Sequence, residues 1–87
     1  MEATTLTPAV AKLVADARAA GFNETRFGNA INLFKGRNPH NHGYPNRGVR
    51  VYLTENGGFY EAHRIDVRLD LALKIPTIKM AREILGL

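Results

Sequence analysis

The feature that most limits how this chain can fold is the segment 36–48, which reads Gly-Arg-Asn-Pro-His-Asn-His-Gly-Tyr-Pro-Asn-Arg-Gly. Its three glycines, two prolines and three asparagines argue against regular secondary structure. The segment divides the 87 residues into two parts that are each too short for a separate domain. We therefore expect one small domain over residues 1–87, with a frayed N-terminal end at residues 1–6.

The stretch before this segment begins with the apolar spacing of an amphipathic helix. Its apolar stripe consists of Val10, Leu13, Val14 and Ala17. Thr7 precedes the stripe as a capping residue, Pro8 suits the first helical position, and Gly21 is a typical left-handed stop. The pattern predicts a helix over residues 8–20.

A second apolar stripe predicts a helix over residues 24–35. Its members are Phe27, Ala30, Ile31 and Phe34. Asn23 is its capping candidate, and Gly36 follows its end. Gly28 lies inside it at a cost of about 1 kcal/mol relative to alanine. Either a close crossing of two helices or a ligand close to the backbone would explain that glycine.

The C-terminal part begins with the pattern of a β-hairpin. Apolar and polar residues alternate over residues 49–54, and Asn56-Gly57-Gly58 is a strong turn signal before a return strand that starts at Phe59. Because an isolated hairpin is not stable alone, we expect its apolar side to pack on the helices.

The alternation resumes over residues 65–75. We expect a strand to about Leu69 and leave residues 70–75 open between strand and helix, because Ala, Leu and Lys favour helices. Pro76-Thr77 then opens a last helix that is unusually apolar.

These patterns together predict an α+β domain with two N-terminal helices, a long basic loop, a β-hairpin and a C-terminal helix. No apolar run approaches the roughly 18–20 residues of a membrane-spanning helix. The first residues lack the regions of a signal peptide, and the chain has no cysteine. We therefore expect a cytoplasmic protein that does not bind a membrane.

Positive charge is concentrated in the middle of the chain. Between Glu24 and Glu55 there is no acidic residue. The basic residues of this acid-free window are Arg26, Lys35, Arg37, Arg47 and Arg50, with His40 and His42 beside them. The window carries a net charge of +5 and the rest of the chain −1. Such an uneven field favours an anionic partner, either nucleic acid or an acidic protein surface.

Residues 15–27 resemble the helix-turn-helix segment of bacterial regulators. The resemblance rests on Ala17, on Gly21 four residues later, and on Phe27 beyond the turn. It implies that residues 24–35 are a recognition helix. The base contacts that it implies fall on Asn23, Thr25, Arg26 and Asn29. An ordinary helical hairpin with a glycine turn has the same pattern and stays an alternative.

The long basic loop, residues 36–48, adds residue types that bind nucleic acid, since Arg and Lys suit phosphates and His and Tyr stack on bases. The candidates in and beside it are Lys35, Arg37, His40, His42, Tyr44, Arg47 and Arg50. We therefore expect a small basic nucleic-acid-binding protein, with DNA favoured over RNA and a homodimer as an open option. The alternative is a phage- or plasmid-type inhibitor or adaptor that docks this loop on an acidic protein.

Catalysis has little support in the sequence. No glycine-rich phosphate loop follows a strand, and the chain has no serine. His40-Asn41-His42 lacks further metal ligands nearby. We expect no enzyme activity, no cofactor and no metal site.

Overall fold

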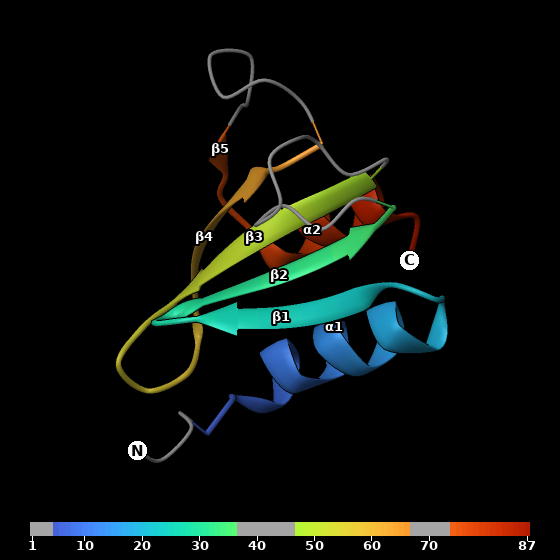
Figure 1. The fold of residues 1–87 in the computed structure, drawn as a ribbon. Helices are drawn as coiled ribbons and strands as arrows, with labels where there is room; N and C mark the ends of the chain where they lie inside the picture. The colour runs from blue at the N-terminus through green and yellow to red at the C-terminus, as the bar shows by residue number, and fades with distance from the viewer. Residues whose placement is uncertain (1–4, 37–46, 67–73) are drawn as a thin grey trace.

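The structure of the protein, a computed structural model, describes residues 5–36, 47–66 and 74–87. These residues form two helices and a five-stranded sheet in two layers (Figure 1). The elements are α1 (Pro8–Ala19), β1 (Asn23–Phe27), β2 (Ala30–Lys35), β3 (Arg47–Leu53), β4 (Phe59–Arg64), β5 (Lys74–Ile75) and α2 (Ile78–Leu85). The strands are antiparallel and lie in the order β1-β2-β3-β4-β5, so each strand pairs with its neighbour in the chain.

The predicted second N-terminal helix is wrong, because residues 24–35 belong to a β-hairpin. Phe27 pairs with Ala30 across the two-residue turn Gly28-Asn29, and Gly28 has a φ of 59°. A left-handed glycine followed by asparagine is a hairpin turn, and Thr, Phe and Ile favour strands over helices. The fold is therefore α+β, but it has one N-terminal helix and a sheet in place of two helices and a single hairpin.

The resemblance to a helix-turn-helix segment fails for the same reason. The residues assigned to a recognition helix lie in β1, in the turn and in β2. Asn23 begins a strand and does not cap a helix. No helix of the described residues follows α1 before α2.

The predicted first and last helices are confirmed. Helix α1 matches the expected residues 8–20 within one residue, and Gly21 follows it with a φ of 96°. Thr7 is its N-cap residue, but the Thr7 side chain makes no capping hydrogen bond. Thr77 does cap α2, because its Oγ1 accepts from the Met80 backbone N–H at 3.2 Å.

The predicted hairpin is confirmed as β3 and β4. Strand β3 begins at Arg47, inside the segment expected to be a loop, because Phe34 pairs with Gly48 and Lys35 with Arg47. A Cβ on Gly48 would lie only 3.0 Å from the Leu33 carbonyl oxygen and from Ile65 Cγ1, so glycine permits this close packing.

The strand expected to reach Leu69 ends at Arg64, and Lys74–Ile75 of the open stretch is β5. The middle residues of that stretch and most of the polar loop lie outside the described residues. Leu6, expected in a frayed end, packs against the core beside Thr7, whose N–H donates to the Gly57 carbonyl at 3.0 Å.

Both helices cover the same face of the sheet. Figure 1 shows α2 behind β2 and β3, and α1 alongside β1. The core between the layers consists of Val10, Leu13, Val14, Ala17, Phe22, Ile31, Leu33, Val49, Val51, Leu53, Ala62, Ile75, Ala81 and Leu85. It includes the apolar side of the hairpin, as expected. Within the described residues, no helix is long and apolar enough to cross a membrane.

An ion pair joins the two helices. Arg82 Nη2 of α2 donates to Asp16 Oδ2 of α1 at 2.7 Å, and Lys12 Nζ lies 3.3 Å from the same oxygen. The hydrogen bond from Arg82 lowers the pKa of Asp16 below its ordinary value. The contact therefore favours the charged carboxylate and links α1 to α2.

Candidate nucleic-acid interface on the outer sheet face

The face of the sheet opposite the helices, called the outer face here, carries one polar row across all five strands. The row consists of Thr25, Asn32, Arg50, His63 and Lys74, which are successive cross-strand partners. Side chains alternate along a strand, and the neighbours of these residues, such as Ile31 and Val51, belong to the core. The row therefore points away from the helices.

Asn32 fixes the centre of this row. It is fully buried, and its Nδ2 donates to Thr25 Oγ1 at 3.2 Å. Its Oδ1 accepts from Arg50 Nε at 2.7 Å. No described residue accepts from the two terminal nitrogens of Arg50. Among the described residues, the guanidinium is thus held through its Nε edge.

A hollow of about 420 Å³ opens beside Arg50. It is lined by Phe27, Asn29, Ala30, Arg50 and Tyr52. Phe27 is 75% exposed, and Tyr52 is half-buried. Two aromatic rings, an amide and a guanidinium around one hollow are groups that stack on bases and bind phosphates.

The far end of the row is a charged cluster on β4 and β5. His63 Nε2 lies 3.0 Å from Glu61 Oε2, and Lys74 Nζ lies 3.4 Å from Glu61 Oε1. The Tyr52 ring meets the His63 ring edge-on at 5.5 Å between centroids. Since the Glu61 carboxylate already contacts the His63 ring and the Lys74 ammonium, the hollow around Arg50 is the better anion site.

The structure separates the predicted contact residues into two groups. Asn23, Thr25 and Arg50 lie on the outer face, and Asn29 lies in the β1–β2 turn beside it. The helix side of the sheet holds Arg26, Lys35 and Arg47. Arg26 is the cross-strand partner of the core residue Ile31. Lys35 and Arg47 are partners of each other and lie two residues from the core residues Leu33 and Val49. Arg37, His40, His42 and Tyr44 lie outside the described residues. The acid-free window therefore does not form one basic face.

The cations on the helix side have contacts of their own. Arg26 Nε donates to Glu24 Oε2 at 2.9 Å. Lys35 Nζ lies 4.6 Å from the centre of the Phe22 ring, a cation–π contact. These contacts give Arg26 and Lys35 a structural role at the edge of the helix layer.

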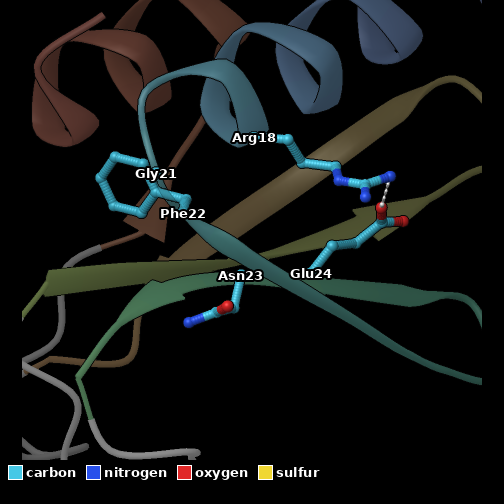
Figure 2. Close-up of a pocket in the computed structure, with 5 residues that line it drawn as sticks. All are labelled: Arg18, Gly21, Phe22, Asn23 and Glu24. Atoms are coloured by element: carbon cyan, nitrogen blue, oxygen red, sulfur yellow. Dashed lines mark ion pairs between the residues drawn. The ribbon is translucent and has the colours of Figure 1, made fainter.

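A second hollow, of about 510 Å³, lies where α1 meets β1. Figure 2 shows Arg18 of α1 and Glu24 of β1 pointing toward each other there, with 3.8 Å between Nη1 and Oε1. The Glu24 carboxylate also accepts from Arg26. Because the lining cation Arg18 is already paired with the Glu24 carboxylate, this hollow suits an anionic ligand less than the one around Arg50.

Sequence reasoning missed Phe27, Asn32 and Tyr52 as site residues. Phe27 was assigned to the apolar stripe of a helix that does not exist. Tyr52 alternates with Val51 and Leu53, which was the available signal that it shares a face with Arg50. Asn32 gave no local signal, since its role comes from contacts with two other strands.

Comparisons of the chain with protein-family models, with curated proteins and with solved structures found no match. In the described part of the chain, no three His, Asp or Glu side chains gather into a group that could hold a metal ion.

Proposed function

We propose that the protein binds single-stranded nucleic acid on the outer face, in the hollow around Arg50. One observation carries this proposal: Arg50 is fixed through Nε to the buried Asn32, beside the rings of Phe27 and Tyr52. A guanidinium held in this way can pair with a phosphate or with the edge of a base. The two rings offer faces on which bases can stack.

A single strand fits this site better than a duplex. Bases can stack on protein rings only when they are unstacked from their own neighbours, as in single-stranded DNA or RNA. The net charge of +4 adds a long-range attraction to the phosphate backbone. As part of the same proposal, we place the protein in the cytoplasm.

Fluorescence anisotropy with labelled oligonucleotides tests the proposal. Single-stranded DNA, single-stranded RNA and a duplex would be titrated over about 50–300 mM salt. We expect a dissociation constant in the micromolar range or below for the single strands, weaker binding of the duplex, and affinity that falls with salt. The DNA and RNA arms identify which of the two strands is preferred.

Two variants separate the charge from the stacking. Arg50→Gln keeps an N–H that can donate to Asn32, removes the charge, and should lower the salt slope by about 0.7 for one lost phosphate contact. Tyr52→Leu should leave the slope unchanged and weaken binding about tenfold, in line with ~1–3 kcal/mol for a stacked base. Circular dichroism would verify that both variants fold.

The matched control is Lys79→Gln, which removes one positive charge from an exposed position on α2 in the helix layer. It should leave the affinity close to that of the unmodified protein. Equal losses in Arg50→Gln and Lys79→Gln would show that net charge alone drives binding. The absence of binding to every oligonucleotide at the lowest salt would overturn the proposal.

A further inference from the structure

Strand β1 is an outer strand of the sheet, and within the described residues it pairs only with β2. Antiparallel strands alternate between residues that exchange hydrogen bonds with a neighbour and residues that do not. The Leu53 N–H donates to the Asn29 carbonyl at 2.8 Å, which fixes this alternation for β2 and β3. The odd-numbered residues of β2 therefore bond to β3, and its even-numbered residues bond to β1.

The register of β1 then assigns its own backbone groups. Asn23, Thr25 and Phe27 stand opposite the even-numbered residues of β2 and bond to them. The N–H and C=O groups of Glu24 and Arg26 consequently point away from β2, toward the edge. No described residue pairs with these four groups, so the edge can accept another strand.

The side chains at this edge are self-complementary. Glu24 and Arg26 are two residues apart, so they lie on the same side of the sheet, with Thr25 between them on the outer face. If a second β1 runs antiparallel with the two Thr25 residues opposite each other, Glu24 meets the partner's Arg26 and Arg26 meets the partner's Glu24. Opposite charges in direct cross-strand positions stabilise an antiparallel pair.

Only one register satisfies both the backbone and the charges. The outward backbone groups must meet one another, so residue 24 can stand opposite 24 or 26, and residue 26 opposite 26 or 24. Pairing 24 with 24, or 26 with 26, sets like charges opposite each other, which destabilises a strand pair. The register centred on Thr25 forms four backbone hydrogen bonds. It also sets each Arg26, which already donates to Glu24 of its own chain at 2.9 Å, opposite the partner's Glu24.

We propose that two copies of this chain associate through their β1 strands, antiparallel and centred on Thr25. The strand has five residues, so the interface is small and the dimer depends on concentration. This interface does not involve α2, and it does not depend on nucleic-acid binding.

Charge reversal in the full-length chain tests this pairing by sedimentation over protein concentrations from about 10 μM to 1 mM. The unmodified protein should approach twice its mass of 9.6 kDa as its concentration rises. Glu24→Arg alone and Arg26→Glu alone should stay monomeric, because each sets like charges opposite each other. The double variant Glu24→Arg/Arg26→Glu should dimerise again, since the charges are complementary once more.

Two further variants keep the test independent of folding effects. Arg26→Pro removes an N–H that points to the edge and makes no bond to β2, so it should give a folded monomer. Lys79→Glu reverses an exposed charge on α2 and should leave dimerisation unchanged.

Three outcomes would overturn the inference. An unmodified protein that stays monomeric up to about 1 mM would show that these charges only keep other strands away from the edge. A dimer that survives both single reversals would place the interface elsewhere. A double variant that folds but stays monomeric would remove the cross-strand ion pairs from the explanation.

Discussion

At the scale of single residues, two glycines have the same left-handed backbone conformation but differ in the space around them. Gly28, in the β1–β2 turn, has a φ of 59°, and a Cβ there would meet no atom within 4 Å. Gly57, in the β3–β4 turn, has a φ of 78°, and a Cβ there would overlap the carbonyl oxygen of Thr5. Gly57 therefore has a packing role that Gly28 lacks.

This contrast predicts unequal costs for the same substitution. Gly28→Ala should lower the free energy of unfolding by about 1–2 kcal/mol, the cost of a left-handed conformation for an L-residue. Gly57→Ala should cost clearly more, because the N-terminal segment must also move away from the turn. Urea denaturation of both variants measures the difference. Equal losses would mean that the contact between Thr5 and the turn contributes nothing to stability.

At the scale of helices and strands, two threonines at helix starts form a second matched pair. Thr77 Oγ1 accepts a hydrogen bond from the Met80 N–H, whereas the Thr7 side chain makes no such bond at the start of α1. Thr77→Ala should therefore cost about 1 kcal/mol, and Thr7→Ala distinctly less. Thermal unfolding of both variants tests this. A larger loss for Thr7→Ala would contradict the assignment of the caps.

The elements that could be predicted from the sequence are those with local signals. Pro8 and Gly21 bound α1, Thr77 starts α2, and the glycines of residues 56–58 mark the β3–β4 turn. These features act through the backbone of a few adjacent residues, so they do not depend on the rest of the fold.

Strand β2 could not be predicted in this way because it is buried on both faces. Ile31 and Leu33 face the helices, while Ala30 and Phe34 are buried on the outer face. A strand buried on both faces loses the alternation of apolar and polar residues by which strands are recognised. The remaining spacing of apolar residues then matches a helix.

The candidate site was predictable only in part for a related reason. Arg50 followed from the acid-free window, and Tyr52 lies on the same strand and the same face, but Phe27 lies on β1, two strands away. Which residues share the hollow is decided by the pairing of three strands. That pairing is a tertiary property, and no local pattern of the sequence contains it.

At the scale of the whole molecule, the two proposals have a joint consequence. Two chains paired through β1 would form one continuous sheet, and Thr25 of both copies would lie on the same face. The two hollows around Arg50 would then open on the same side. A long single strand could contact both, whereas a short one could occupy only one.

This geometry predicts that the affinity depends on oligonucleotide length, because a long strand bound in one hollow is held at a high effective concentration near the other. At protein concentrations where the dimer forms, a strand of about 24 nucleotides should bind more tightly than one of about 8, by as much as ~100-fold, because its second contact is intramolecular. Glu24→Arg should remove most of this gain, so that the long and the short strand bind with similar affinity, since Glu24 lies on the helix side, away from the hollow. Glu24→Arg/Arg26→Glu should restore the gain, and anisotropy with both strands measures it. A length dependence that persists in the monomeric variant would show that long strands are bound without pairing of the β1 edges.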